Sequence, residues 1–344
     1  MKDTLNLFYL ANSRYGGWVT FTSHLKHGMG DGARIFRITK TDERKDRDFG
    51  YGVRYRNITH ETAVRMQGPK LIVAADKNFR ETQIELIKQG AWLVIHDPTE
   101  LRNPEFRDIV KEERTIILGK KAKEYLPQAH YIPHPYKPVN SVHKINGSGH
   151  LWPGIWEKRY SHCVSVSRLD FDKNSHWLFE ANRILPEPRR VLIRGAENRM
   201  YTRTKLMPKY PEYLQDSKRP KDDRQVFPRE FSWAVNFLAT ARYMTDFSLI
   251  SGDGGRTQYT FMEAWDAGTI VLLHSGWILP EDDMVDEGMK QNCISISNWE
   301  TLASFLTADL SSKEVDAIRD NGKYKLEQHD YIKIGQQYLE VMNV

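Results

Sequence analysis

The sequence predicts an α/β protein with two consecutive doubly wound domains, each built on a parallel sheet. Short apolar runs alternate with amphipathic segments along the 344 residues, as in repeated βαβ units. The run Leu71–Ala75 is continuously apolar, which is typical of a parallel strand covered on both faces. The alternation stops in the turn-rich residues 134–160 and then restarts, so we expect a linker there. A single core rarely grows beyond about 250–300 residues, which also favours two domains.

Each expected strand is an apolar or β-branched run, and each expected helix repeats its apolar residues every three to four positions. The strands expected in the first domain are 5–10, 33–38, 71–75, 92–95, 115–118 and 131–133, with helices at 19–28 and 79–89. The strands expected in the second domain are 162–166, 190–194, 247–250, 269–273 and 294–296, with helices at 175–185, 259–267, 299–308 and 331–342.

Composition narrows the class of protein. Hydrophobic residues make up 40% of the chain and aromatic residues 11%, and the net charge is only +5, which excludes global disorder. No stretch reaches the roughly 18–20 apolar residues that span a bilayer, and the first apolar run is too short for a signal peptide. Two cysteines, Cys163 and Cys293, make neither a disulfide framework nor a cysteine zinc site. We therefore expect a cytoplasmic monomer without membrane attachment.

Gly16 and Gly17 lie between the first expected strand and the first expected helix. Glycines at such a turn let a ligand approach the backbone, and the N-terminus of the helix behind them favours an anion. The segment contains neither Gly-x-Gly-x-x-Gly nor Gly-Lys-Ser/Thr, so it predicts neither a dinucleotide fingerprint nor a P-loop. An ordinary tight turn is the alternative interpretation.

His96 and Asp97 close the strand 92–95, and Pro98 stops that strand. A histidine and a carboxylate at the carboxyl end of a strand can act as a general base or stabilise positive charge. The alternative is that the pair caps a loop.

Arg168 and Lys173 follow the strand 162–166. An arginine fork and a lysine point charge could converge on a diphosphate, whereas the alternative is a solvated loop of mixed charge.

The Gly-rich loop 252–255 leads into the helix 259–267, and this is the densest functional signal in the chain. The first backbone N–H groups of that helix, at Tyr259 and Thr260, could hold phosphate oxygens. Glu263 lies one turn further along the same face and can accept hydrogen bonds from ribose hydroxyls. A flexible loop before a capped helix is the alternative.

The stretch 189–229 contains twelve Lys or Arg and five Asp or Glu, interleaved with aromatic residues. Basic and aromatic side chains together suit a phosphate backbone and an unstacked base, while a solvated insertion is the alternative. The candidate DNA contacts are Arg199, Arg203, Lys205, Lys218, Arg219 and Lys221. The twelve histidines match no metal-binding spacing, so we expect no metal site.

The order of these segments resembles the GT-B glycosyltransferases, which have two Rossmann-like domains facing across a cleft and hold the sugar donor mainly on the second. Gly16-Gly17 is similar to the N-terminal Gly-Gly loop of that family. Residues 166–173 resemble its Gly-Arg-Leu…Lys segment, with Ser167 in place of Gly. Residues 261–269 resemble its Leu-Glu-Ala-Met-Ala-x-Gly-Thr signature, whose Glu binds the donor ribose. The paired Glu that the family carries eight positions before that Glu is replaced by Gly255.

This departure narrows the resemblance to the bacteriophage DNA α-glucosyltransferases, which transfer glucose from UDP-glucose to 5-hydroxymethylcytosine in phage DNA. Their corresponding stretch is similar to Tyr259-Thr260, Glu263 and Gly268-Thr269. They also carry a His-Asp pair like His96-Asp97, and a Gln-His-Asp-like segment before a closing helix, like residues 328–330.

The resemblance implies an acceptor-binding domain at 1–150, a donor-binding domain at 151–327 and a closing helix at 328–344 that packs back on the first domain. It implies sugar transfer with retention from a UDP-sugar, either UDP-glucose or a UDP-pentose such as UDP-arabinose, to a hydroxymethylated base in double-stranded DNA. No metal or other cofactor is expected. The implied catalytic residues are Asp97, His96 and Arg168. The implied donor-binding residues are Gly16, Gly17, Arg168, Lys173, Gly195, Tyr259, Thr260 and Glu263.

Two alternatives remain open at this point. One is a GT-B glycosyltransferase that acts on a polysaccharide, lipid or protein. The other is a non-catalytic DNA- or nucleotide-binding protein on the same scaffold.

Overall fold

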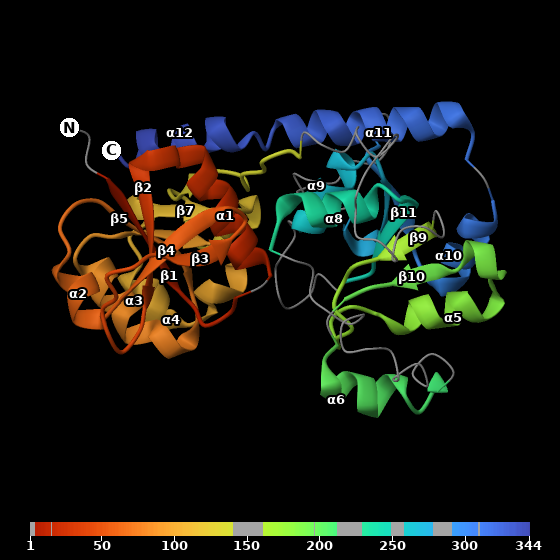
Figure 1. Ribbon diagram of the computed structural model, residues 1–344, viewed down its shortest axis with the longest axis horizontal. Coiled ribbons are helices and arrows are strands. Elements are labelled where there is room, and N and C mark those ends of the chain that lie inside the picture. The colour runs from red at the N-terminus through yellow and green to blue at the C-terminus, as the bar shows by residue number, and fades with distance from the viewer. Residues whose placement is uncertain are drawn as a thin grey trace. The chain divides into compact units, whose positions relative to one another are not determined.

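The computed structural model describes residues 4–14, 16–139, 161–195, 197–211, 229–248, 258–277, 291–308 and 310–344. The chain divides into two compact units, each with its own sheet (Figure 1). The first unit comprises Met1–Lys137, Asp253–Tyr259 and Glu327–Val344, and the second comprises Pro138–Gly252 and Thr260–Leu326. No helix in the described parts of the chain is long and apolar enough to cross a membrane.

The first unit contains an eight-stranded sheet in the order β3-β4-β2-β1-β5-β6-β7-β8. All neighbouring strands are parallel except the β3–β4 hairpin at one edge. The strands are β1 (Leu5–Leu10), β2 (Ala33–Ile38), β3 (Arg47–Gly50), β4 (Val53–Ile58), β5 (Lys70–Ala75), β6 (Trp92–Ile95), β7 (Thr115–Ile117) and β8 (His130–Tyr131). The central strand β1 is buried at every position, as its run of apolar residues predicts.

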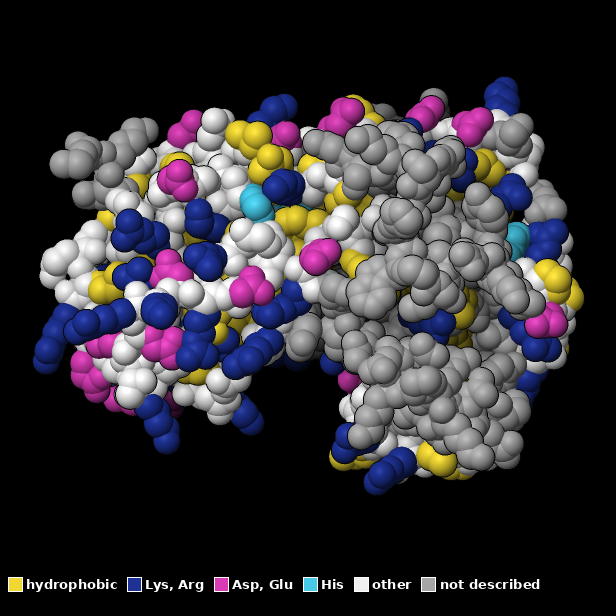
Figure 2. Space-filling view, viewed as in Figure 1, with side chains coloured by type: hydrophobic (Ala, Val, Ile, Leu, Met, Phe, Trp, Pro, Cys, Tyr) yellow, Lys and Arg dark blue, Asp and Glu magenta, His cyan; other side chains and the backbone are white. Residues whose placement is uncertain are grey.

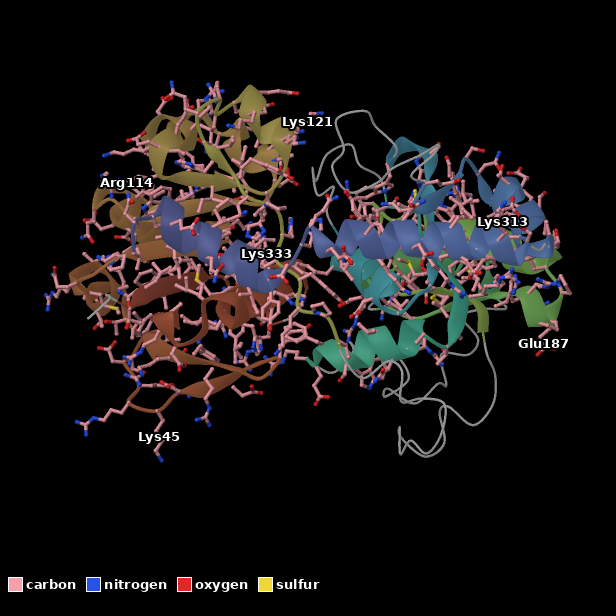
Figure 3. The ribbon with its side chains drawn as sticks, turned by 90° about the horizontal axis from the view of Figure 1, so that it is seen from above. Lys45, Arg114, Lys121, Glu187, Lys313 and Lys333 are labelled. Carbon is pink, nitrogen blue, oxygen red and sulfur yellow. The ribbon has the colours of Figure 1, made fainter. Side chains whose placement is uncertain are left out.

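Helices cover both faces of this sheet (Figure 1). One face carries α2 (His60–Arg65), α3 (Arg80–Lys88) and α4 (Pro104–Ile109), whose apolar residues share one core cluster with the strands. The other face carries α1 (Gly17–Met29) and the C-terminal α12 (Tyr331–Val341). Seen from above, α12 lies over the first unit and carries the exposed Lys333 (Figure 3).

The second unit contains a five-stranded, fully parallel sheet in the order β10-β9-β11-β12-β13. The strands are β9 (Ser161–Ser165), β10 (Val191–Ile193), β11 (Ala241–Asp246), β12 (Ile270–His274) and β13 (Cys293–Ile296). Its helices are α5 (His176–Ile184), α6 (Arg199–Tyr201), a π-helical turn (Thr202–Leu206), α8 (Phe231–Leu238), α9 (Tyr259–Asp266), α10 (Trp299–Thr307) and α11 (Ser312–Glu327).

Most predicted elements are present within a residue or two of the expected bounds, but one predicted strand is wrong. We expect a strand at 247–250, whereas the strand of this region is β11, which ends at Asp246. Hydropathy conceals β11 because Arg242, Thr245 and Asp246 interrupt its apolar residues. Phe247 and Ser248 follow the strand, and residues 249 and 250 lie outside the described ranges, as does most of the predicted linker.

The β3–β4 hairpin is the main element that the sequence analysis missed. Val53 and Tyr55 are buried while Arg54 is exposed, and this period of two is the signal that identifies β4. The turn between the strands places Tyr51 at φ 56° and Gly52 at φ 74°, as a two-residue hairpin loop requires. Lys45, in the loop before β3, points away from the sheet (Figure 3). Helices α8 and α11 were also missed.

A pair of glycines lets α1 and α12 cross at backbone distance. A Cβ atom on Gly28 would lie 2.0 Å from the Tyr331 carbonyl oxygen, and one on Gly335 would lie 2.5 Å from the Gly28 carbonyl carbon. Next to this crossing, Asp330 caps α12 by accepting from the N–H groups of Ile332 and Lys333. The last helix is therefore fixed to the first one by backbone packing as well as by side chains.

We expect Gly28→Ala to destabilise the protein by about 1–3 kcal/mol, because a methyl group cannot fit against the α12 backbone without moving that helix. Urea unfolding of the parent and the variant measures this difference. Gly32→Ala is the matched control, since a Cβ there meets no atom within 4 Å. Equal stability of the two variants would contradict the close crossing.

Candidate functional site

The loop after β1 leads into α1 through Gly16 and Gly17. Gly16 has φ +94°, a conformation that disfavours any residue with a side chain, and its carbonyl oxygen accepts from the N–H groups of Val19 and Thr20. Gly17 is different, because its φ is not positive and a Cβ there would meet no atom within 4 Å. Among the described residues, neither backbone strain nor packing explains Gly17.

The side chains around this loop hold it in place. The N–H of Asn12 donates to Asp76 Oδ2 at 3.0 Å, and Arg37 Nη2 donates to the Ala11 carbonyl oxygen at 2.9 Å. Tyr9 Oη donates to the Ser13 carbonyl oxygen at 2.9 Å. The approach to Gly16 is thus anchored on strands β1, β2 and β5.

His96 follows β6 and is half-buried under α1. Its ring contacts Phe21 edge-to-face, with centroids 4.7 Å apart, and Nε2 lies 2.7 Å from the Val73 carbonyl oxygen. Burial lowers the pKa of His96 to about 4, so the ring is neutral near pH 7. With Nε2 donating to Val73, Nδ1 is left as a hydrogen-bond acceptor.

Asp97 caps the 3₁₀ turn Pro98–Arg102. Capping of a loop is the alternative that the sequence offers to a catalytic role for this pair. Its Oδ1 accepts from the N–H of Thr99 at 2.7 Å. Asp97 is half-buried, and burial raises its pKa, although the hydrogen bonds from Thr99 oppose that rise. Thr99 therefore hydrogen-bonds to the Asp97 carboxyl group through its backbone N–H and also through its side chain.

Glu100 completes the capping box and was missed by the sequence analysis. Its Oε1 accepts from the N–H groups of both His96 and Asp97, each at 2.9 Å. Burial raises the pKa of Glu100 to about 8 despite these donors. The spacing Asp97-x-x-Glu100 after a strand is the signal that could have revealed it. Glu100 thereby fixes the backbone that presents His96 and Asp97.

Buried histidines extend the site in the first unit. His134 follows β8, is 7% exposed, and its ring lies 6.3 Å from that of His96 and 5.6 Å from that of Tyr259. Its Nδ1 has no hydrogen-bond partner in the described ranges. His24 is fully buried on α1 and stacks on Tyr259, with centroids 4.9 Å apart. Burial places the pKa values of both His24 and His134 well below the usual range.

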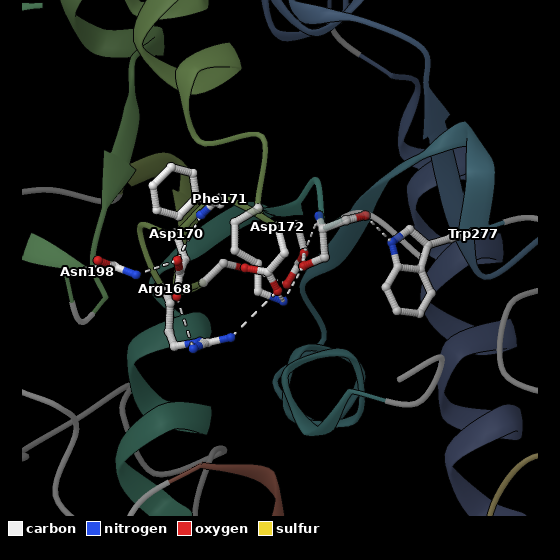
Figure 4. Close-up of polar contacts among 10 residues, drawn as sticks. Arg168, Asp170, Phe171, Asp172, Asn198 and Trp277 are labelled. Carbon is white, nitrogen blue, oxygen red and sulfur yellow. Dashed lines mark hydrogen bonds and ion pairs between the residues drawn. The ribbon is translucent and has the colours of Figure 1, made fainter. Parts of the chain in front are cut away.

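In the second unit, the loop after β9 carries the predicted diphosphate ligands. The Arg168 side chain is 60% exposed and pairs with Asp170 at 3.1 Å and with Asp172 at 3.6 Å, as Figure 4 shows. Lys173 is only 8% exposed; its Nζ donates to Ser248 Oγ at 2.8 Å and lies 3.4 Å from Asp172. The lysine is fixed, whereas the contacts of the arginine in the described ranges are with the acidic side chains of its own loop.

Gly195 follows β10 and passes directly over the Arg168 loop. A Cβ there would lie 2.1 Å from the Ser167 carbonyl oxygen, so packing alone requires glycine. Asn198 then ties the two segments together, because its N–H donates to the Leu169 carbonyl oxygen at 2.9 Å and its Nδ2 donates to Asp170 Oδ1 at 2.8 Å (Figure 4). These contacts bring Gly195 next to Arg168.

Helix α9 carries Tyr259, Thr260 and Glu263. The Glu263 carboxyl group has no hydrogen-bond partner in the described residues; burial, and then the nearby Asp266 carboxyl, raises its pKa to about 8. Thr260 Oγ1 is likewise buried without a partner in those residues. Tyr259 Oη donates to the Pro135 carbonyl oxygen at 3.1 Å. The Gly-rich loop before α9 lies outside the described residues.

The predicted DNA contacts Arg199, Arg203 and Lys205 lie on α6 and the following π-helical turn, where all three are exposed. Lys218, Arg219 and Lys221 lie outside the described residues. The sequence analysis missed a second group of basic residues on the first unit, where Lys and Arg side chains gather on the visible face (Figure 2). Around the β3–β4 hairpin the exposed basic side chains are Arg34, Arg44, Lys45, Arg47 and Arg54.

A groove of about 610 Å³ lies between the amino ends of β2 and β4 in this basic region, lined by Lys26, Arg34, Arg54 and Arg56 among others. It is at the opposite edge of the sheet from His96 and Asp97. Within the described ranges, no three His, Cys, Asp or Glu side chains gather as a metal site requires.

Comparison with known proteins identifies the fold. No family model and no curated protein matches the sequence. Anabaena HepE in complex with UDP and glucose matches with a TM-score of 0.66 and 14% identity over 99% of each chain. The α,α-trehalose-phosphate synthase (UDP-forming) from Burkholderia vietnamiensis matches with a TM-score of 0.66 and 12% identity over 100% of each chain.

An α-glucosyltransferase in complex with UDP and a 13-mer DNA containing an HMU base matches with a TM-score of 0.60 and 11% identity, over 99% of this chain and 100% of that one. The chain therefore has the GT-B fold, and the predicted fold class is confirmed. At these identities the likeness concerns the fold.

We expect His134→Phe to flatten the loss of stability in acid. The parent His134 takes up a proton near pH 6.5 when unfolded but stays neutral when folded, so it stabilises the fold above pH 6.5 and loses that contribution as pH falls. The stability difference between parent and variant should change by up to about 1.4 kcal/mol per pH unit below pH 6.5. Urea unfolding at pH 7.5, 6 and 5 measures it. A difference that is constant across this range would mean that only packing was lost.

Proposed function

We propose that this chain is a glycosyltransferase that transfers glucose from UDP-glucose to the hydroxymethyl group of a modified pyrimidine in DNA. The main support for binding of the UDP-sugar is Glu263, a carboxyl group with a raised pKa and no hydrogen-bond partner in the described residues. A polar group left unpaired in a folded protein costs stability, so its retention favours a ligand that pairs with it.

Donor binding is assigned to the first half of α9 and to the start of α1. Glu263 accepts hydrogen bonds from the ribose hydroxyls, and the N–H groups of Tyr259 and Thr260 face phosphate oxygens. Gly16 and Gly17 admit the donor close to the backbone of the first unit. The absence of any packing reason for Gly17 supports this role.

Charge stabilisation is assigned to Arg168 and Lys173. When the bond between the sugar and the diphosphate breaks, negative charge builds up on UDP, and two nearby cations lower the energy of that state. Gly195 allows the backbone after β10 to lie against this loop. Binding of the diphosphate requires Arg168 to leave Asp170 and Asp172, which is inexpensive because the arginine is largely exposed.

Acceptor chemistry is assigned to His96 and Asp97. Nδ1 of the neutral His96 ring can accept a hydrogen bond from a sugar hydroxyl. The Asp97 carboxyl group can take the proton of the acceptor hydroxyl or stabilise the developing positive charge on the sugar. Following the resemblance of the sequence, we propose that the anomeric configuration is retained.

We expect Glu263→Ala to weaken UDP binding by about 10–100-fold, since removing one partner of a buried hydrogen bond costs roughly 1–3 kcal/mol. Isothermal titration calorimetry with UDP measures the affinity. Glu300→Ala removes an exposed carboxylate from α10 and is the matched control. An unchanged UDP affinity in Glu263→Ala would remove Glu263 from the donor site.

DNA is the favoured acceptor for two reasons. The α-glucosyltransferase of similar fold was captured with UDP and DNA. This chain also exposes basic side chains on α6 and around the β3–β4 hairpin, as a phosphate backbone requires. The second candidate is a sugar acceptor, which the similar fold of the trehalose-phosphate synthase favours.

We expect turnover with UDP-glucose and duplex DNA that contains 5-hydroxymethylcytosine, and none with unmodified DNA. UDP-arabinose in place of UDP-glucose tests the choice of sugar.

DNA affinity should fall linearly with salt on logarithmic axes, with a slope of about −0.9 for each phosphate contacted. Combining Arg199→Ala with Arg203→Ala should flatten that slope. A salt-independent affinity, or transfer only to free sugars, would exclude DNA as the acceptor.

A further inference from the structure

We propose that Asp246 is a positioning residue, which acts through Ser248 to fix the Lys173 ammonium where the donor diphosphate binds. This inference rests on the proposed function, because it assumes that Lys173 binds UDP. Asp246 is the last residue of β11, the central strand of the second unit, and it is 1% exposed. The sequence analysis did not single it out.

Both carboxyl oxygens of Asp246 are engaged. The Ser167 hydroxyl donates to Oδ2, which holds the residue next to Arg168. The Ser248 hydroxyl donates to Oδ1, and the N–H of Ser248 donates to the same oxygen at 2.9 Å. One buried carboxyl group therefore joins the loop after β9 to the segment after β11.

The Ser248 hydroxyl group links Asp246 to Lys173 through hydrogen bonds. Since its hydroxyl hydrogen is given to Asp246, its oxygen can accept, and Lys173 Nζ donates to it at 2.8 Å. Trp277, after β12, donates from Nε1 to the Ser248 carbonyl oxygen at 3.0 Å (Figure 4). The orientation of the Ser248 hydroxyl, and with it the place of the ammonium, is set by Asp246.

Stability alone is a poor explanation for this arrangement. Buried polar networks often contribute less stability than apolar packing of the same volume, but they fix one geometry. Thr245, one position earlier on β11, is the contrast: its hydroxyl is buried without a hydrogen-bond partner in the described residues. Among the described residues the Thr245 hydroxyl joins no other segment, whereas Asp246 connects the loop after β9 to the segment after β11.

The test is a double-mutant cycle between Asp246 and Lys173. Asp246→Asn keeps the shape of the side chain, but it removes the negative charge and leaves one acceptor oxygen in place of two, so the hold on the serine hydroxyls weakens. We expect UDP affinity, measured by calorimetry, to fall about tenfold in Asp246→Asn. In the Lys173→Ala background the same change should cost nothing further, because the group that it positions is gone.

Two further variants make the result specific. Ser248→Ala leaves the contact between Ser167 and Asp246 intact and should weaken UDP binding as Asp246→Asn does, which keeps the test valid if Asp246→Asn folds poorly. Thr245→Val is the control for a change on the same strand and should bind UDP like the parent.

Additive losses in the double variant, or full UDP affinity in both Asp246→Asn and Ser248→Ala, would overturn the positioning role while leaving the proposed function intact. Failure of the parent protein to bind UDP would overturn the proposed function and this inference together.

Discussion

Parallel strand pairing is the constraint on which the candidate site depends. Because parallel strands all end at the same edge of a sheet, every connection that follows a strand returns functional groups to that edge. In the first unit this rule collects Gly16, His96 and His134 after β1, β6 and β8. In the second unit it collects the Arg168 loop, Gly195 and Ser248. The site residues are spread over most of the chain, yet each unit gathers its own set by topology alone.

The sequence predicts the fold well wherever local pattern and tertiary environment agree. β1, β2 and β6 have the predicted bounds because buried parallel strands require apolar runs. β11 was misplaced for the opposite reason, since its polar residues serve the site and the strand is held by its neighbours. The β3–β4 hairpin was missed because charged side chains interrupt its apolar ones, so its mean hydropathy resembles that of a loop.

The residues of the candidate site also divide into those that the sequence predicts and those that it does not. Glu263 and the Gly16-Gly17 pair belong to short local motifs, so they can be identified from the sequence alone. Asp246 and His134 carry none, because their importance comes from contacts with Ser167, His96 and other residues far away in sequence. Asp97 lies between these cases: the sequence leaves capping and catalysis open, and the structure shows that Asp97 caps the turn that follows it.

The crossing of Gly28 and Gly335 has a consequence for biosynthesis. β1 is translated before the second unit, whereas α12, which covers the sheet of the first unit, is translated after it. All of the second unit is translated in the interval. The second unit can therefore reach its native state first. Until then the nascent first unit keeps an apolar helix face exposed, to which chaperones can bind.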